Sequence, residues 1–248
     1  MTTTSKNTIL IHGYGFDYRT WYPLELAFEG HDVIYLSLPG FGLEPLTEEY
    51  SISALANKFW KHLDEIGIGQ VNLVGHSMGG YVCLEMLSLQ SSRVSSLALL
   101  HSHVYADSPE KKSARTDTLN TIKSDGASGF ISKFYPGLFA DIDKSEHLIK
   151  MLIRRGLQYD YNAWYYGTMA MRDRRDHSDT LKNAVDIPVL LLMGGADKAV
   201  PAELALKQSI LAERTSFHMY ESTGHLGMYE NTRQVISDLI RFYAEFAS

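Results

Sequence analysis

The stretch Val71-Asn72-Leu73-Val74-Gly75-His76-Ser77-Met78-Gly79-Gly80 decides the fold of this chain. Residues 71–74 form a short apolar run that predicts a buried strand, and a helix is predicted over 81–89. Between them, residues 75–79 match the pattern G-x-S-x-G, in which a serine occupies a sharp turn from a strand into a helix. The flanking glycines are needed because side chains there would clash with the turn, and the helix directs the positive end of its dipole toward the serine. The stretch therefore predicts a serine hydroxyl held out at the carboxyl end of a buried strand.

Short apolar runs alternate with segments of helical period along most of the chain. Strands are predicted at 9–12, 33–38, 71–74, 97–100, 189–193 and 217–220, and helices at 21–30, 52–66, 81–89 and 235–246. Strands that are apolar throughout and separated by helices are typical of a parallel sheet covered on both faces. Ligands bind such sheets at the carboxyl ends of the strands, which is where the candidate residues below are found.

Residues 105–185 break this alternation. Helices are predicted there at 108–122, 129–135, 145–157 and 159–172, and the segment is rich in aromatic residues and methionine. We expect a helical cap inserted into a core made of residues 1–104 and 186–248, with an apolar underside over the strand ends. The alternative is that the aromatic side chains pack a small core within the insertion. The charged segment Ser108–Arg115 (SPEKKSAR) is assigned to a solvated helix face.

The composition indicates an ordinary globular protein, and 248 residues are enough for one large domain or for one domain with a small insertion. Lys and Arg number 23 and Asp and Glu 29, so the net charge of −6 gives no electrostatic reason to bind nucleic acid or anionic lipid. A single cysteine, Cys83, excludes an internal disulfide. The first residues do not combine a basic start with a long apolar run, and no run reaches the roughly 18 apolar residues of a membrane span. We predict a cytoplasmic protein with a small-molecule substrate as its partner; the sequence does not define the oligomeric state.

Four motifs in a fixed order resemble those of the α/β-hydrolase family over nearly the full chain. The first is the G-x-S-x-G stretch. His12-Gly13-Tyr14-Gly15 resembles that family's oxyanion loop, and Pro39-Gly40-Phe41-Gly42 resembles its P-G-x-G turn. Gly194-Gly195-Ala196-Asp197-Lys198-Ala199-Val200-Pro201 resembles its G-x-x-D-x-x-V-P segment. The resemblance implies an α/β-hydrolase fold, trimmed here to about six strands, all parallel, because one strand must use several of the eleven residues before His12.

The resemblance also implies a catalytic triad. Ser77, Asp197 and His225 follow one another in the order that this fold uses for its nucleophile, acid and base. The oxyanion would be held by the backbone N–H groups of Tyr14 and Met78. His12 would brace the oxyanion loop, and the P-G-x-G turn is likewise expected to be structural.

The expected role of each histidine follows from its position in the chain. Of ten histidines, His225 alone follows the last strand at the required distance from the acid. His31, His62, His147 and His177 lie in polar surroundings and are interpreted as surface residues, and His218, within the last strand, as structural. His101 and His103 flank Ser102 at a strand end, which leaves two interpretations for each, a substrate contact or a structural histidine. No third ligand at useful spacing favours a metal. Substrate contacts are assigned to His103, Trp164 and Leu226.

A serine nucleophile excludes the relatives of this fold that use aspartate, the haloalkane dehalogenases and epoxide hydrolases. We predict a serine hydrolase that cleaves a small to medium, apolar carboxylic ester through an acyl-enzyme. A thioesterase, lactonase, carbon–carbon bond hydrolase or perhydrolase would use the same triad. No cofactor and no metal are expected, because the chain has no G-x-G-x-x-G after a strand and no P-loop. Two other interpretations are a slow-turnover small-molecule receptor on this scaffold and a doubly wound binding protein whose serine is incidental.

Overall fold

All six predicted strands pair in one parallel sheet. A computed structural model of the chain describes residues 6–246. The strands are β1 (Asn7–Ile11), β2 (Asp32–Leu36), β3 (Val71–His76), β4 (Val94–Leu100), β5 (Val189–Gly194) and β6 (Thr215–Tyr220), arranged in the order β2-β1-β3-β4-β5-β6. Every neighbouring pair is parallel. The predicted α/β class and the parallel sheet are therefore confirmed.

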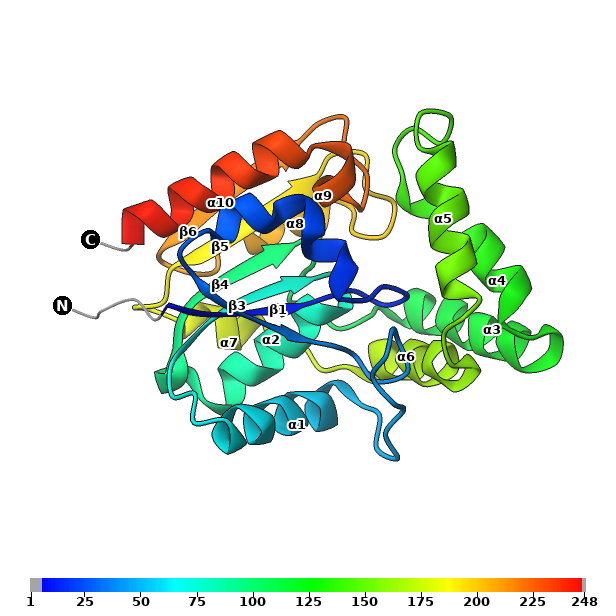
Figure 1. The fold of residues 1–248 in the computed structure, drawn as a ribbon, viewed down its shortest axis with the longest axis horizontal. Helices are drawn as coiled ribbons and strands as arrows, with labels where there is room; N and C mark the ends of the chain where they lie inside the picture. The colour runs from blue at the N-terminus through cyan, green and yellow to red at the C-terminus, as the bar shows by residue number, and fades with distance from the viewer. Residues whose placement is uncertain (1–5, 247–248) are drawn as a thin grey trace.

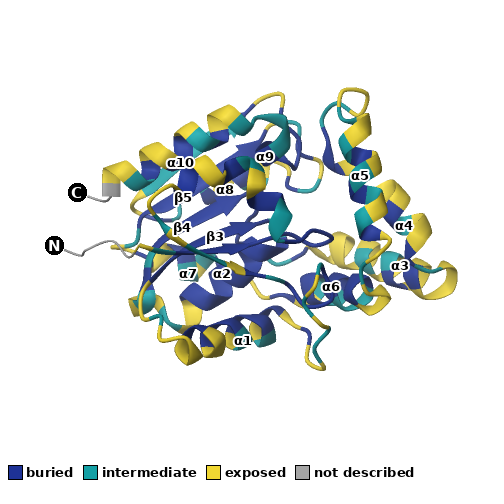
Figure 2. Cartoon of the chain, viewed as in Figure 1, coloured by how far each residue is buried: buried dark blue, intermediate teal, exposed yellow. Residues whose placement is uncertain are grey.

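The central strands are the most deeply buried part of the molecule. Every residue of β3 and β5 is buried, whereas the edge strand β6 is half-buried along most of its length and β2 is exposed or half-buried except at Leu36. Figure 2 shows the same contrast, with a buried centre and exposed outer helix faces. Burial on both faces explains why the central strands are apolar throughout rather than alternating.

Helices cover both faces of the sheet. Helices α1 (Ile52–Glu65), α2 (Met78–Leu89) and α7 (Ser178–Lys182) lie on one face, and the 3₁₀ helix η1 (Tyr18–Phe28) and α10 (Thr232–Phe246) lie on the other (Figure 1). Short elements complete the core: η2 (Ser91–Arg93), α8 (Ala202–Gln208) and α9 (Gly227–Glu230). The helix predicted over 21–30 is thus a 3₁₀ helix that starts earlier, because the Asp17 side chain caps it and Pro23 inside it lacks an N–H.

The segment between β4 and β5 forms the four predicted helices. They are α3 (Pro109–Asp125), α4 (Ala127–Phe134), α5 (Glu146–Gly156) and α6 (Tyr161–Asp173), with the short 3₁₀ helix η3 (Pro136–Leu138) after α4. Figure 1 shows them gathered at one end of the molecule, beyond the carboxyl ends of the strands. Within the described part of the chain, no helix has the length and apolar character needed to cross a membrane.

Candidate active site

Ser77 lies at a strained turn between β3 and α2. Its backbone has φ 52° and ψ −117°, in a region that residues with a Cβ rarely adopt. A Cβ on Gly79 would lie 2.1 Å from the carbonyl oxygen of Ile11, and one on Gly75 would lie 2.5 Å from the backbone of Gly80. The turn can therefore form only with glycine at both positions, as the motif predicted, and it holds the serine hydroxyl out beyond the sheet.

The structure brings Ser77, His225 and Asp197 together. The Ser77 Oγ atom lies 2.8 Å from Nε2 of His225, and Nδ1 of the same ring lies 2.7 Å from Oδ2 of Asp197. The serine comes from the end of β3, the aspartate from the loop after β5 and the histidine from the loop after β6. With Nδ1–H donating to the carboxylate, Nε2 is left to accept the serine proton.

The Asp197 carboxylate is buried and held on both oxygens. Oδ1 accepts the backbone N–H groups of Ala199 and Val200 at 2.8 and 2.9 Å. Burial alone would raise the pKa of Asp197, but the adjacent His225 and polar contacts from both His225 and His101 outweigh it and hold the pKa well below its usual range. The group is therefore an ionised carboxylate that can orient His225 and stabilise its charged form.

The loop after β1 brings the Tyr14 amide to this site. Within residues 6–246, the N–H groups of Tyr14 and Met78 make no hydrogen bond, so both are available as donors. The Tyr14 hydroxyl donates to the Trp164 carbonyl oxygen at 2.7 Å, which ties the loop to α6. His12 accepts the Leu38 N–H on Nε2 at 3.0 Å, and its Nδ1 lies 2.9 Å from the Gly13 oxygen, as a bracing role requires.

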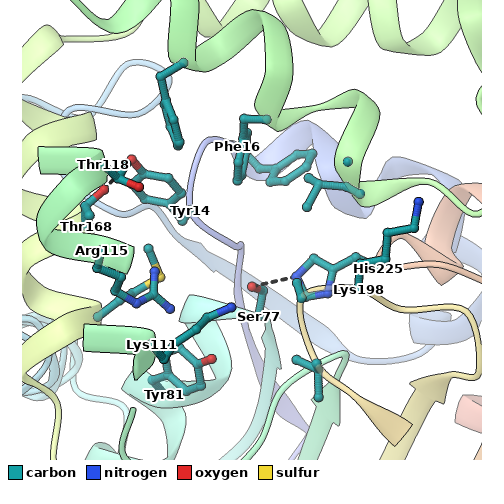
Figure 3. A pocket seen from close by; sticks show the side chains of 17 residues that line it. Tyr14, Phe16, Ser77, Tyr81, Lys111, Arg115, Thr118, Thr168, Lys198 and His225 are labelled. Atoms are coloured by element: carbon teal, nitrogen blue, oxygen red, sulfur yellow. Dashed lines mark hydrogen bonds between the residues drawn. The ribbon is translucent and has the colours of Figure 1, made fainter. Parts of the chain in front are cut away.

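Ser77 and His225 open into a cavity of about 260 Å³ (Figure 3). Aromatic and aliphatic side chains form much of its wall, and three cationic side chains also line it. The apolar members are Tyr14, Phe16, Tyr81, Phe130, Phe134, Leu138, Met171, Ala199 and Val200; the cations are Lys111, Arg115 and Lys198. The underside of the insertion is therefore apolar only in part.

Lys111 and Arg115 have a second role that the sequence did not predict. The segment Ser108–Arg115 is a solvated helix face as predicted, since residues 108–114 are exposed and Arg115 is half-buried, yet Lys111 and Arg115 also line the cavity. Their spacing could have indicated this, since residues four apart share one face of a helix, and α3 begins shortly after the carboxyl end of β4. The orientation of that face toward the serine could not be read from the sequence.

Comparison with known proteins shows the family to which the chain belongs. A profile described as the alpha/beta hydrolase family matches residues 8–238. The chain belongs to this family. It is 27% identical over 241 residues to the dihydrolipoyllysine-residue acetyltransferase component of the acetoin cleaving system of Pseudomonas putida, covering 94% of this chain. The chain spans only 62% of the length of that relative.

Two further proteins match this α/β hydrolase over nearly their whole length. The pimeloyl-[acyl-carrier protein] methyl ester esterase of Pseudoalteromonas atlantica is 26% identical, with 96% of this chain and 94% of the relative covered. A thermophilic esterase from Thermogutta terrifontis, solved with malate bound, superposes with a TM-score of 0.90 at 23% identity, covering 100% of this chain and 92% of the esterase. The structural likeness shows the fold.

The three residues expected to contact the substrate in this hydrolase lie elsewhere. His103, Trp164 and Leu226 are buried and are not among the described residues that line the cavity. Trp164 packs edge-on against Tyr14, with 5.1 Å between ring centroids, so it supports the loop after β1. His103 accepts the Tyr105 N–H, and Leu226 belongs to the core. These assignments failed because a side chain near the site in sequence can point into the core.

His177 differs from the prediction, whereas His101 takes the structural one of the two roles that the sequence left open. His177 is buried rather than at the surface, with Nε2 2.9 Å from Oε2 of Glu85. His101 joins the triad as a structural contact: its Nδ1 lies 3.4 Å from Oδ2 of Asp197, and its Nε2 accepts the Gly227 N–H at 3.0 Å.

A cluster of possible metal ligands overlaps the triad. Three possible ligand atoms lie within 4.8 Å of one another, one each from His101, Asp197 and His225. The Gly227 N–H bond to Nε2 of His101 assigns the ring proton to Nδ1, the atom that faces Asp197. A protonated nitrogen cannot be a metal ligand, and Nδ1 of His225 is itself bonded to the same carboxylate. The cluster therefore fits a hydrogen-bonded triad better than a metal centre.

Proposed function

We propose that this chain is a serine hydrolase that cleaves a small to medium carboxylic ester through an acyl-enzyme. The observation that carries the proposal is the continuous contact from Ser77 through His225 to Asp197, at 2.8 and 2.7 Å. It begins at a serine whose strained backbone exposes the hydroxyl to a cavity. A cavity of about 260 Å³ suits a small ligand rather than a long lipid chain.

The first half of the reaction forms the acyl-enzyme. Ser77 Oγ attacks the ester carbonyl carbon while Nε2 of His225 takes the hydroxyl proton. Asp197 keeps the ring in the required tautomer and stabilises the imidazolium. The N–H groups of Tyr14 and Met78 bind the tetrahedral oxyanion, and each such donor contributes about 3 kcal/mol. The alcohol leaves with the proton from His225, and the acyl group stays on Ser77.

The second half releases the acid. Water takes the place of the alcohol, His225 removes its proton, and the second tetrahedral intermediate collapses to the carboxylic acid and free Ser77. We assign residues 105–185 the role of a cap that surrounds the substrate, because Lys111, Phe130 and Met171 from this segment line the cavity.

The test is hydrolysis of p-nitrophenyl esters from acetate to decanoate by the wild type and by Ser77→Ala. We expect repeated turnover by the wild type, with an optimum at short to medium chains, and a loss of about a thousandfold or more in Ser77→Ala. Equal activity of the two proteins would exclude Ser77 as the nucleophile. Stoichiometric binding without turnover would favour a small-molecule receptor instead.

A further inference from the structure

We propose that Lys111 and Arg115 form an anion subsite, and that the preferred substrate is an ester with a carboxylate at the end of a short apolar chain. The inference deepens the proposed hydrolase function and rests on it. It goes beyond a general apolar ester by naming a charged group and the two side chains that bind it.

The two cations lie side by side on α3 and face the cavity. Residues 111 and 115 are one helical turn apart, and Figure 3 shows both charged groups directed into the space in front of Ser77. Lys198 lines the same cavity. Like charges four residues apart on a helix repel each other, and among the described residues only Arg115 of this pair has a direct ionic partner, Asp107.

Arg115 is anchored in a way that leaves its outer nitrogens free. Its Nε donates to Asp107, which is buried and also lies 2.7 Å from Nη1 of Arg174. Within the described chain, the two terminal nitrogens of Arg115 make no hydrogen bond. A guanidinium held by Nε presents two parallel N–H donors, the geometry that binds a carboxylate in a bidentate manner.

Lys111 is near Asp107 and Asp197 but is not paired directly with either carboxylate. Among the described residues, its ammonium group makes no hydrogen bond and no ion pair within 4.0 Å. Partial desolvation, followed by repulsion from the nearby Arg115, lowers the pKa of Lys111 from its ordinary value. A bound carboxylate would offset both effects.

The charge of the cavity differs from that of the whole chain. The protein carries a net charge of −6, yet its seventeen lining residues include three cations and neither aspartate nor glutamate. A cleft lined by one sign of charge, with apolar walls, concentrates its field on ligands of the opposite sign. Phe130, Phe134 and Met171 supply apolar wall for the methylene chain between the ester and the carboxylate.

The test compares two esters of equal length and the same leaving alcohol. Monomethyl adipate ends in a carboxylate, and methyl hexanoate ends in a methyl group. We expect the wild type to prefer the anionic ester in kcat/KM by about tenfold or more, mainly through KM, because charge-assisted hydrogen bonds favour it. The same comparison with the monomethyl esters from succinate to suberate, each beside a neutral methyl ester of equal length, identifies the best spacing between ester and carboxylate.

The variants are Lys111→Gln and Arg115→Gln, with Lys112→Gln as the matched control. Lys112 carries the same charge on the same helix, is exposed, and does not line the cavity. We expect the preference for the anionic ester to fall about tenfold in each of the first two variants and to stay within twofold in the control. An equal fall of this preference in Lys112→Gln would show that the positive charge of the whole helix, and not a subsite at Lys111 and Arg115, attracts the anionic ester.

The outcomes separate this inference from the proposed function. If the wild type hydrolyses the neutral esters and shows no preference for the anionic ones at any length, the subsite is wrong and the hydrolase stands. If it hydrolyses neither series, the hydrolase proposal fails, and calorimetry with monomethyl adipate then tests the subsite alone. Binding that weakens about tenfold in Lys111→Gln but not in Lys112→Gln would support the subsite; no binding, or equal binding to both variants, would overturn it.

Discussion

The Nδ1 atom of His101 lies 3.4 Å from Oδ2 of Asp197, the carboxylate oxygen that also accepts the hydrogen bond from His225. His101 is one of two described residues other than glycine with positive φ, and the other is Ser77. Both strained residues therefore lie at the triad, with His101 beside Asp197 and Ser77 against His225. Strained backbone persists only where the surrounding structure enforces it, and here the Gly227 N–H bond to Nε2 directs Nδ1 of His101 at the acid.

The first prediction concerns this contact. We expect His101→Asn to lower kcat on a p-nitrophenyl ester about tenfold and to leave KM nearly unchanged, because Asp197 loses one of the groups that fix it while the cavity wall is untouched. Asparagine tolerates the φ of 50° at this position, so the variant adds little backbone strain. An increase in KM with unchanged kcat would instead make His101 a substrate contact.

The second prediction concerns the acid. In Asp197→Asn, the amide oxygen can still accept the Ala199 and Val200 N–H bonds, while the amide nitrogen faces Nδ1 of His225. The ring would then adopt the other tautomer and could not take the Ser77 proton, so we expect kcat to fall by about four orders of magnitude. Thermal unfolding checks that the variant is folded. A loss of only a few-fold would show that Asp197 does not orient the base.

The third prediction concerns the turn around Ser77. A Cβ on Gly79 would lie 2.1 Å from the Ile11 oxygen, a backbone atom of β1 that cannot move without disturbing the sheet. We expect Gly79→Ala to cost about 3 kcal/mol or more in the free energy of unfolding, or to prevent folding. Gly69→Ala is the control, because nothing lies within 4 Å of its added Cβ. Similar stability of the two variants in urea unfolding would contradict the steric argument.

The fold was largely predictable because strands that are buried on both faces are apolar throughout, and such runs can be recognised in the sequence. Residues 189–193 are apolar throughout and form most of β5, which is buried on both faces. The G-x-S-x-G stretch likewise encodes its own turn, since Gly75 and Gly79 are required by close backbone approach. The 3₁₀ character of η1 was missed because the helical period does not separate a 3₁₀ helix from an α-helix when Pro23 interrupts the hydrogen bonds.

The site was predictable only where a residue is fixed by a strand end. Ser77 directly follows β3, while Asp197 and His225 lie in the loops after β5 and β6, and the carboxyl ends of parallel strands meet at one edge. Lys111 and Arg115 were not found, because the direction that a helix face takes depends on how α3 packs and not on its own sequence. Trp164 was misplaced for the same reason, since its ring packs against the loop after β1.

The fourth prediction concerns pH and His103. Burial, followed by repulsion from Arg174, lowers the pKa of His103 from 6.5 to about 3. Between these values the unfolded chain binds a proton that the native state does not, so stability falls as the pH falls through this window. Each such histidine contributes a slope approaching about 1.4 kcal/mol per pH unit.

The measurement is urea unfolding of the wild type and of His103→Gln from pH 6.5 to 4.5. We expect the slope of the free energy of unfolding against pH to be shallower in the variant by about 1 kcal/mol per pH unit, because one proton-binding group of the unfolded chain is removed. His62→Gln, which removes an exposed ring on α1, is the control and should keep the wild-type slope. If His103→Gln keeps that slope as well, the ring binds its proton in the folded protein too, and burial and Arg174 do not lower its pKa.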